Sequence, residues 1–88
     1  MSDSPLELRR RRLRFRAWHR GTREADLLLG SFADRHLAAF SEPELDQFEA
    51  LLDQTDADLY DWITARAPVP AAFDHAVMTQ LRGFRFTP

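Results

Sequence analysis

The fold is decided by ADLLLGSFADRHLAAF, residues 25–40, in which apolar side chains recur at the spacing of an α-helix. Such spacing lines up apolar groups along one side of the helix and leaves the other side to water. Asp26, Asp34 and Arg35 fall between the apolar positions and are expected to face solvent. The stripe itself consists of Leu28, Leu29, Phe32, His36, Leu37 and Phe40. We expect this helix to be the centre of the core.

A preceding helix is expected over residues 6–18, because Ser4 is a good N-cap and Pro5 suits the first turn. Its apolar residues do not form one stripe, so it should dock on one side and offer arginine and aromatic side chains on the other. Gly21 suits the end of this helix, since glycine accepts backbone conformations that other residues avoid. Thr22 is then placed to cap the helix of the central stripe.

Three more helices are expected toward the C-terminus. Ser41 and Glu44 have the spacing of a capping box. Asp56 is expected to cap the next helix, which should end before Pro68. The last helix is expected over residues 71–82. The side chains that these helices should bury are Leu45, Phe48, Leu51, Leu52, Leu59, Trp62, Ile63, Phe73, Val77 and Leu81.

The expected fold is therefore all-α, a single small five-helix bundle, because no segment shows the alternation of a strand. A chain of 88 residues has room for one core. We assign the domain to residues 6–84, with tails at residues 1–5 and 85–88. Cysteine is absent, and no apolar run reaches the length of a membrane span or a secretory signal. A cytoplasmic protein without membrane insertion is expected.

Charge is unevenly distributed along the chain. Residues 1–24 hold eight arginines against three acidic residues, a balance of +5, whereas residues 25–88 hold four against eleven, a balance of −7. Such a split indicates a basic face for an anionic partner, or a basic helix lying against its own acidic domain. A small basic-helix module that binds nucleic acid is the alternative function, with Phe15 and Trp18 stacking on bases. Repulsion by the acidic remainder disfavours it, and no nucleic-acid partner is expected.

The sequence does not predict an enzyme, and no catalytic residue is assigned. His19, His36 and His75 lack the spacing of metal ligands, so no metal site is expected. The aspartates of residues 53–61 fail the pattern of a calcium loop, and no phosphate-binding or nucleophile motif is present. His36 lies on the apolar stripe and is interpreted as a core histidine with one hydrogen-bond partner.

The segment RGTRE, residues 20–24, contains the pattern R-G-x-x-E, and matching segments follow it in order: DLLLGSFA at residues 26–33, DLYDW at residues 58–62 and PxxF at residues 70–73. In these features the chain resembles the succinate dehydrogenase flavinylation factors, a family of small five-helix proteins of bacteria and mitochondria. The resemblance extends over residues 12–84.

The resemblance implies an assembly factor that binds the flavoprotein subunit of succinate dehydrogenase, with fumarate reductase as a second candidate client. It implies that the factor promotes covalent attachment of FAD to a histidine of that subunit. Members of the family hold the client so that its own histidine and the flavin react, and they supply no bond-forming group. No cofactor would be bound stably, and a monomer is expected.

By the same resemblance, Arg20, Gly21 and Glu24 form the centre of the contact with the partner. We add their neighbours as further partner-binding residues, namely Arg16, Trp18, His19, Arg23 and Asp26. Taken without the resemblance, the segment is a capped turn in which Arg20 or Arg23 pairs with Glu24. Tyr60 and Trp62 are open to either a core or a contact role. The role of the arginine run at residues 9–12 is also open, between contact with an acidic flavoprotein surface and solubility.

Overall fold

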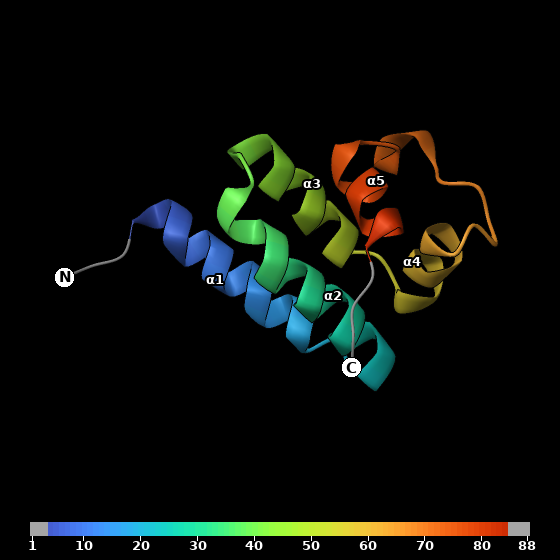
Figure 1. Cartoon of the computed structure of the whole chain (residues 1–88), viewed down its shortest axis with the longest axis horizontal. Helices are drawn as coiled ribbons and strands as arrows, with labels where there is room; N and C mark the ends of the chain where they lie inside the picture. The colour runs from blue at the N-terminus through green and yellow to red at the C-terminus, as the bar shows by residue number, and fades with distance from the viewer. Residues whose placement is uncertain (1–3, 85–88) are drawn as a thin grey trace.

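The structure is a computed structural model that describes residues 4–84, and it confirms an all-α fold with five α-helices in this part of the chain (Figure 1). The expected tail at residues 85–88 and the first three residues lie outside the described range. Two short 3-10 turns complete the fold. The elements are α1 (Pro5–Trp18), α2 (Arg23–His36), the turn Leu37–Ala39, α3 (Glu42–Leu52), α4 (Asp56–Ile63), the turn Ala71–Phe73 and α5 (Ala76–Gly83).

The predicted caps of the first three helices are present. The Ser4 hydroxyl accepts the Glu7 N–H at 3.1 Å, and the Thr22 hydroxyl accepts the Ala25 N–H at 3.3 Å. Ser41 forms a complete capping box with Glu44. Since the first N–H groups of a helix have no partner within it, these polar side chains fix where each helix begins.

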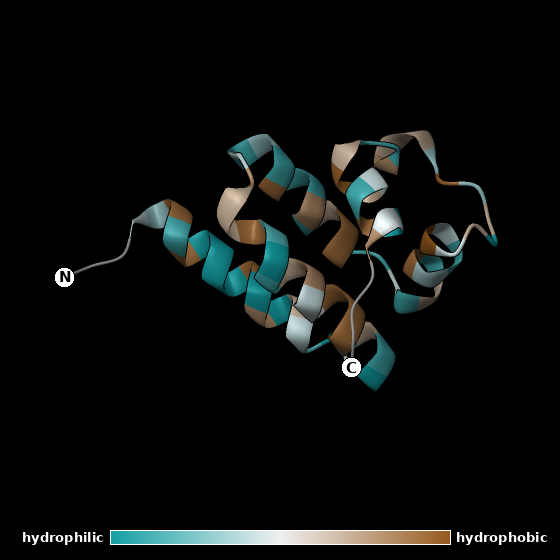
Figure 2. Ribbon diagram, in the orientation of Figure 1, coloured by the Kyte–Doolittle hydropathy of each residue, from teal (hydrophilic) through white to brown (hydrophobic). Residues whose placement is uncertain are grey.

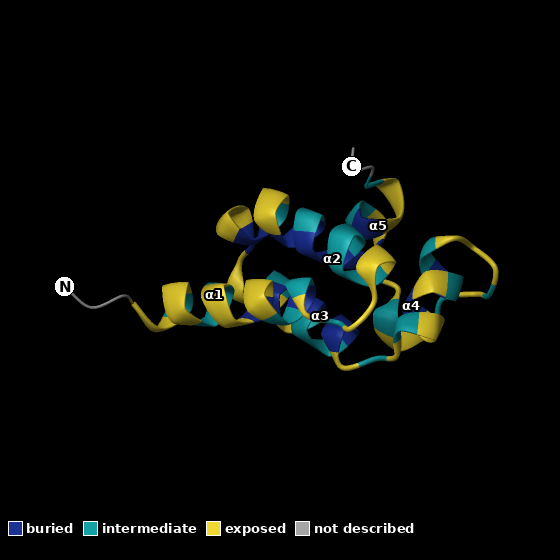
Figure 3. Cartoon of the chain, turned by 90° about the horizontal axis from the view of Figure 1, so that it is seen from below, coloured by how far each residue is buried: buried dark blue, intermediate teal, exposed yellow. Residues whose placement is uncertain are grey.

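The chain turns back on itself after α1, so that α1 and α2 lie side by side and run in opposite directions (Figure 1). α3 packs against α1, α5 packs against α3, and α4 contacts α5 at one end of the molecule. Buried residues line the space between the helices, while exposed residues cover the outer sides (Figure 3). α2, the helix of the central stripe, thus buries its apolar side in the core, as the sequence predicts.

Phe32 is fully buried and occupies the middle of an aromatic cluster. Its ring centroid lies 5.6 Å from that of Phe48, 5.4 Å from that of Phe84 and 4.5 Å from that of His36. His36 packs against this cluster, as its place on the stripe predicts, but it is only half-buried. The hydrogen-bond partner expected for it is not found among residues 4–84. Burial, and to a lesser degree the charge of Arg35, lowers the pKa of this imidazole.

α1 and α2 approach closely where Trp18 lies against Gly30. A Cβ atom on Gly30 would come within 2.1 Å of Cδ2 of the Trp18 indole, so only glycine leaves room for the ring. The indole N–H also donates to the Asp34 carboxylate at 3.2 Å. This contact fixes the end of α1 on α2 and thereby positions the corner that follows.

α1 is hydrophilic along most of its length (Figure 2). Several of its arginines bind acceptors on other parts of the molecule. Arg9 pairs with Asp46 at 2.5 Å and with Glu49 at 2.9 Å on α3. Arg10 donates to the carbonyl oxygens of Leu37 and Phe40, both at 2.9 Å. Of the two explanations for the uneven charge, a basic helix lying against its own acidic domain accounts for these arginines.

Three details of the C-terminal half differ from the predictions. The cap of α4 is Thr55, whose hydroxyl accepts the Asp58 N–H at 3.1 Å, and Asp56 is instead the first residue of the helix. The helix predicted over residues 71–82 is split, because the His75 ring caps a new helix by accepting the Met78 N–H at 3.1 Å. Phe73 is only half-buried in the preceding turn.

α4 ends with the two hydrogen bonds of a Schellman motif. The Arg66 N–H donates to the Asp61 carbonyl at 2.8 Å, and the Ala65 N–H donates to the Trp62 carbonyl at 3.3 Å. Ala65 has a φ of +61°, the left-handed conformation in which such motifs favour glycine. The helix end is therefore closed by a residue that adopts this conformation at a cost.

Candidate docking site

The corner between α1 and α2 is centred on Gly21, which has a φ of +113°. Residues with a Cβ rarely adopt this value, so glycine is needed for the backbone itself. A Cβ atom built there would meet no atom within 4 Å, and the residue is exposed. The space beside the corner is open, and the backbone is accessible to another molecule.

Arg20 lies under the corner and faces inward, with a side chain that is 11% exposed. Its guanidinium donates to the Asp56 carboxylate at 2.8 Å, to the Gln54 carbonyl at 2.6 Å and to the Leu52 carbonyl. These acceptors belong to the end of α3, the link that follows it and the start of α4. Arg20 therefore joins the corner to α3 and α4, and its donors are used within the chain.

Asp26 holds the corner from the other side. Its Oδ1 accepts the Arg20 N–H at 2.6 Å and the Gly21 N–H at 3.2 Å. The expectation that Asp26 simply faces water is wrong, because its carboxylate supplies the acceptor for two backbone groups that the turn leaves without a helical partner. Arg20 and Asp26 thus shape the predicted site from within.

The predicted residues that remain open to solvent at the corner are His19, Gly21, Arg23 and Glu24. The His19 ring stacks on Phe15 with centroids 3.9 Å apart, and its Nδ1 lies 2.7 Å from the Phe15 carbonyl oxygen. Neither Arg23 nor Glu24 forms an ion pair with any of residues 4–84. The ion pair with Glu24 considered for this turn is thus missing, and Arg20 pairs with Asp56 instead.

Two other predicted contact residues lie on the seams between helices. Arg16 is half-exposed and pairs with Asp53 of the α3 end at 2.8 Å. Trp18 is half-buried by its contact with Gly30. Each leaves part of its side chain accessible next to the corner, and each also has a structural contact.

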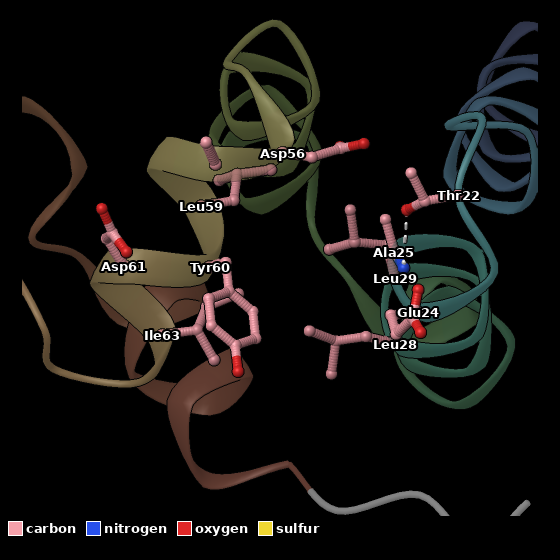
Figure 4. Close-up of a pocket in the computed structure, with 11 residues that line it drawn as sticks. Thr22, Glu24, Ala25, Leu28, Leu29, Asp56, Leu59, Tyr60, Asp61 and Ile63 are labelled. Atoms are coloured by element: carbon pink, nitrogen blue, oxygen red, sulfur yellow. Dashed lines mark hydrogen bonds between the residues drawn. The ribbon is translucent and has the colours of Figure 1, made fainter.

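A groove of about 620 Å³ begins at Glu24 and runs between α2 and α4. Figure 4 shows Leu28 on the α2 side across from Tyr60 and Ile63 on the α4 side. Its remaining lining residues are Thr22, Ala25, Leu29, Asp56, Ala57, Leu59 and Asp61. The docking surface that the corner can offer therefore combines exposed polar groups with an adjacent apolar groove.

Sequence reasoning placed Leu28 and Ile63 in the core, whereas both are only partly buried and line the groove. Trp62 is buried at 8% exposure and therefore has the core role, whereas Tyr60 is 52% exposed and is free to make a contact. The partial exposure of Leu28 could have been predicted, because the three consecutive leucines at residues 27–29 span about 200° around the helix axis. That arc is wider than one core-facing stripe, so some of it had to face elsewhere.

Neither a cluster of metal ligands nor a membrane-spanning helix is present among the described residues. Within residues 4–84, no three histidine or acidic side chains are grouped so that they could hold a metal ion. No helix in the same range is long and apolar enough to cross a membrane.

A family model described as "Flavinator of succinate dehydrogenase" matches residues 11–85 of the chain. The match includes the corner, both walls of the groove and all of the core helices except the first turns of α1. It agrees with the resemblance in the residue patterns.

Several curated proteins are similar to the chain. "FAD assembly factor SdhE" of Acetobacter pasteurianus is 41% identical over 70 residues, which cover 80% of this chain and 64% of that protein. "Succinate dehydrogenase assembly factor 2, mitochondrial" of Mycosarcoma maydis is 44% identical over 68 residues, 77% of this chain and 29% of that protein. The factor 2-B of Drosophila persimilis is 37% identical over 82 residues, 91% and 52% respectively. The chain thus spans less than two thirds of the length of each of these relatives.

Proposed function

We propose, from the premise that this chain belongs to the family of succinate dehydrogenase flavinators, that it is an assembly factor for the flavoprotein subunit of that enzyme. It binds the subunit and promotes the covalent attachment of FAD to it. The names of the relatives, a FAD assembly factor and succinate dehydrogenase assembly factors, support this role.

The observation that carries the proposal is the construction of the corner. Arg20 and Asp26 hold the backbone from within, and Gly21 presents it to open space with no side chain in the way. Glu24 and Arg23 extend outward beside it without an internal ion pair among residues 4–84. A preorganised surface of this kind loses little freedom when a partner binds, and its charged groups can form charge-assisted hydrogen bonds.

The contribution of the chain is to position the client rather than to supply a reacting group. An assembly factor accelerates a reaction of its client by stabilising the arrangement in which the client's own histidine and the flavin meet. In this proposal FAD is held by the client and is attached there, and the chain itself keeps no cofactor. The family is one of assembly factors, so the chain is not itself an enzyme.

The finer parts of the expectation belong to the same proposal. The chain acts as a monomer in the cytoplasm, and the flavoprotein subunit of fumarate reductase is a second client. Nucleic acid is not a partner, because Arg9, Arg10 and Arg16 are committed to contacts within the protein. Because these arginines are already paired, less positive charge is available on α1 to bind a phosphate backbone.

The test mixes the chain with the unflavinylated flavoprotein subunit, FAD and a dicarboxylate, and measures the flavin fluorescence of the subunit band after denaturing electrophoresis. We expect covalent flavin to accumulate faster with the chain than without it, and a complex to be isolated by gel filtration. The same assay with the fumarate reductase subunit tests the second client. An unchanged rate together with no complex for the succinate dehydrogenase subunit would overturn the proposal.

A further inference from the structure

We propose that the groove between α2 and α4 binds a segment of the client flavoprotein that carries a large apolar side chain next to a lysine or arginine. This inference rests on the proposed function and adds the chemistry of the segment that the chain recognises. Three features support it, namely the apolar walls, the charge of the rim and the position of the groove beside the corner.

The walls of the groove leave apolar surface without a partner. Leu28 and Ile63 are only partly buried, and Tyr60 is 52% exposed. The Tyr60 hydroxyl makes no hydrogen bond to any of residues 4–84, so the ring can pack on an incoming side chain while its hydroxyl bonds to the same segment. Figure 4 shows this ring on the α4 wall, facing Leu28 on the α2 wall. An apolar side chain that enters here would remove the exposed apolar surface from water.

The rim selects the charge of the partner. Glu24, Asp56 and Asp61 line the groove, and among the described residues no basic side chain does. Arg20 neutralises Asp56 by their ion pair, whereas Glu24 and Asp61 have no ion pair within residues 4–84. The net negative charge of the rim favours a lysine or arginine beside the apolar group. It disfavours a free flavin nucleotide, whose diphosphate would meet these carboxylates.

The groove is continuous with the corner. Thr22 and Glu24 belong to the α1–α2 corner and also line the groove. A client seated on Gly21 therefore reaches the groove without crossing intervening surface. The ion pair of Arg20 with Asp56, which lies in α4, also fixes the α4 wall relative to the corner. Corner and groove together then form one docking surface with a polar part and an apolar part, the usual composition of a protein interface.

The test compares two exposed apolar side chains. Tyr60→Ala removes the ring in the groove, and Leu8→Ala removes a side chain that is 38% exposed on α1, away from both the groove and the corner. Binding of each variant to the unflavinylated subunit is measured by fluorescence anisotropy, with melting curves to confirm that both fold. We expect Tyr60→Ala to weaken binding at least about tenfold and Leu8→Ala to change it less than about twofold. Glu24→Gln should reduce the dependence of binding on salt.

The occupant is identified by photo-crosslinking with benzoylphenylalanine at position 60, followed by mass spectrometry. The proposal expects a client peptide that has an apolar residue with lysine or arginine next to it. It is overturned by a crosslink to a second copy of the chain, by an acidic client peptide, by specific binding of FAD alone, or by wild-type affinity of Tyr60→Ala. If wild-type chain and subunit do not bind each other at all, the proposed function itself fails. If they bind and Tyr60→Ala binds equally well, only the groove assignment fails.

Discussion

Arg20 and Asp56 form an ion pair, with 2.8 Å between the guanidinium Nε and the carboxylate Oδ1, that ties the corner after α1 to the first residue of α4. Through this pair the two parts of the docking surface, the corner and the far wall of the groove, are held in one arrangement. The arginine of the R-G-x-x-E pattern thus has a structural role within the chain, beneath the proposed contact surface.

This role predicts a loss of stability when Arg20 is removed. Arg20→Ala leaves the Asp56 carboxylate and the carbonyls of Leu52 and Gln54 without their donor, so we expect the free energy of unfolding to fall by about 2–3 kcal/mol. Arg20→Lys should recover only part of the loss, because an ammonium cannot reproduce the fork of donors. Urea unfolding measures both. A folded Arg20→Ala variant of unchanged stability that fails to bind the client would show that Arg20 is a contact residue instead.

The packing of Trp18 on Gly30 predicts that Gly30→Ala destabilises the protein despite the higher helix propensity of alanine. The added methyl group would overlap the indole, and we expect a loss of about 1–3 kcal/mol. The matched measurement is the double variant Trp18→Leu with Gly30→Ala. If the overlap is the cause, Gly30→Ala should lower the free energy of unfolding much less when Trp18 is replaced by leucine. Equal losses with tryptophan and with leucine at position 18 would contradict the account.

The left-handed conformation of Ala65 predicts a stabilising substitution. Ala65→Gly should raise the free energy of unfolding by about 0.5–1 kcal/mol, because glycine adopts the conformation of the Schellman motif without the steric cost of a Cβ. The control is Ala50→Gly within α3, where the backbone is helical and glycine should destabilise by about 1 kcal/mol. Thermal unfolding of both variants checks the opposite signs.

His75 predicts a dependence of stability on pH. Its Nδ1 accepts the Met78 N–H, and its Nε2 is buried without a hydrogen-bond partner among residues 4–84. Burial lowers the pKa of this imidazole below the ordinary value of 6.5. Since the unfolded chain then takes up a proton at higher pH than the folded one, stability is complete above about pH 6.5 and falls as the pH drops below it. His36 acts in the same direction.

The matched variant is His75→Asn, which keeps a side chain able to cap α5 and removes the titrating group. Between about pH 7.5 and about pH 5.5, on either side of the ordinary histidine pKa, the wild-type protein should lose more stability than the variant, whose remaining loss comes largely from His36. Urea unfolding at the two pH values measures this difference. Identical losses in both proteins would exclude His75 as a source of the pH dependence.

Local patterns predicted much of this structure. The stripe of residues 25–40 identified the central helix, and the polar residues before α1, α2 and α3 identified where those helices begin. Both features depend on groups close in sequence. The same holds for the exposed Gly21 at the corner, since the conformation of a turn is set by its own few residues.

The rest depended on contacts between residues far apart in the chain. The acceptors of the Arg20 side chain lie 32 to 36 residues away, so local patterns suggested only that Arg20 or Arg23 pairs with Glu24. The groove was missed for the same reason, because Leu28 and Ile63 look like core residues until the separation of α2 and α4 is known. The helix predicted over residues 71–82 was split because the His75 side chain served as a cap, a role that histidine fills less often than serine or aspartate.

The most direct test of the docking corner compares Gly21→Arg with Gly21→Ala in the flavin attachment assay. Both variants have the strain of a side chain at a φ of +113°, a cost of about 1–3 kcal/mol, but only arginine fills the open space beside the corner. With melting curves confirming that both fold, we expect Gly21→Ala to promote covalent flavin attachment nearly as wild type does, and Gly21→Arg to give no more than the client alone. Equal activity of the two variants would contradict the claim that the partner docks at Gly21.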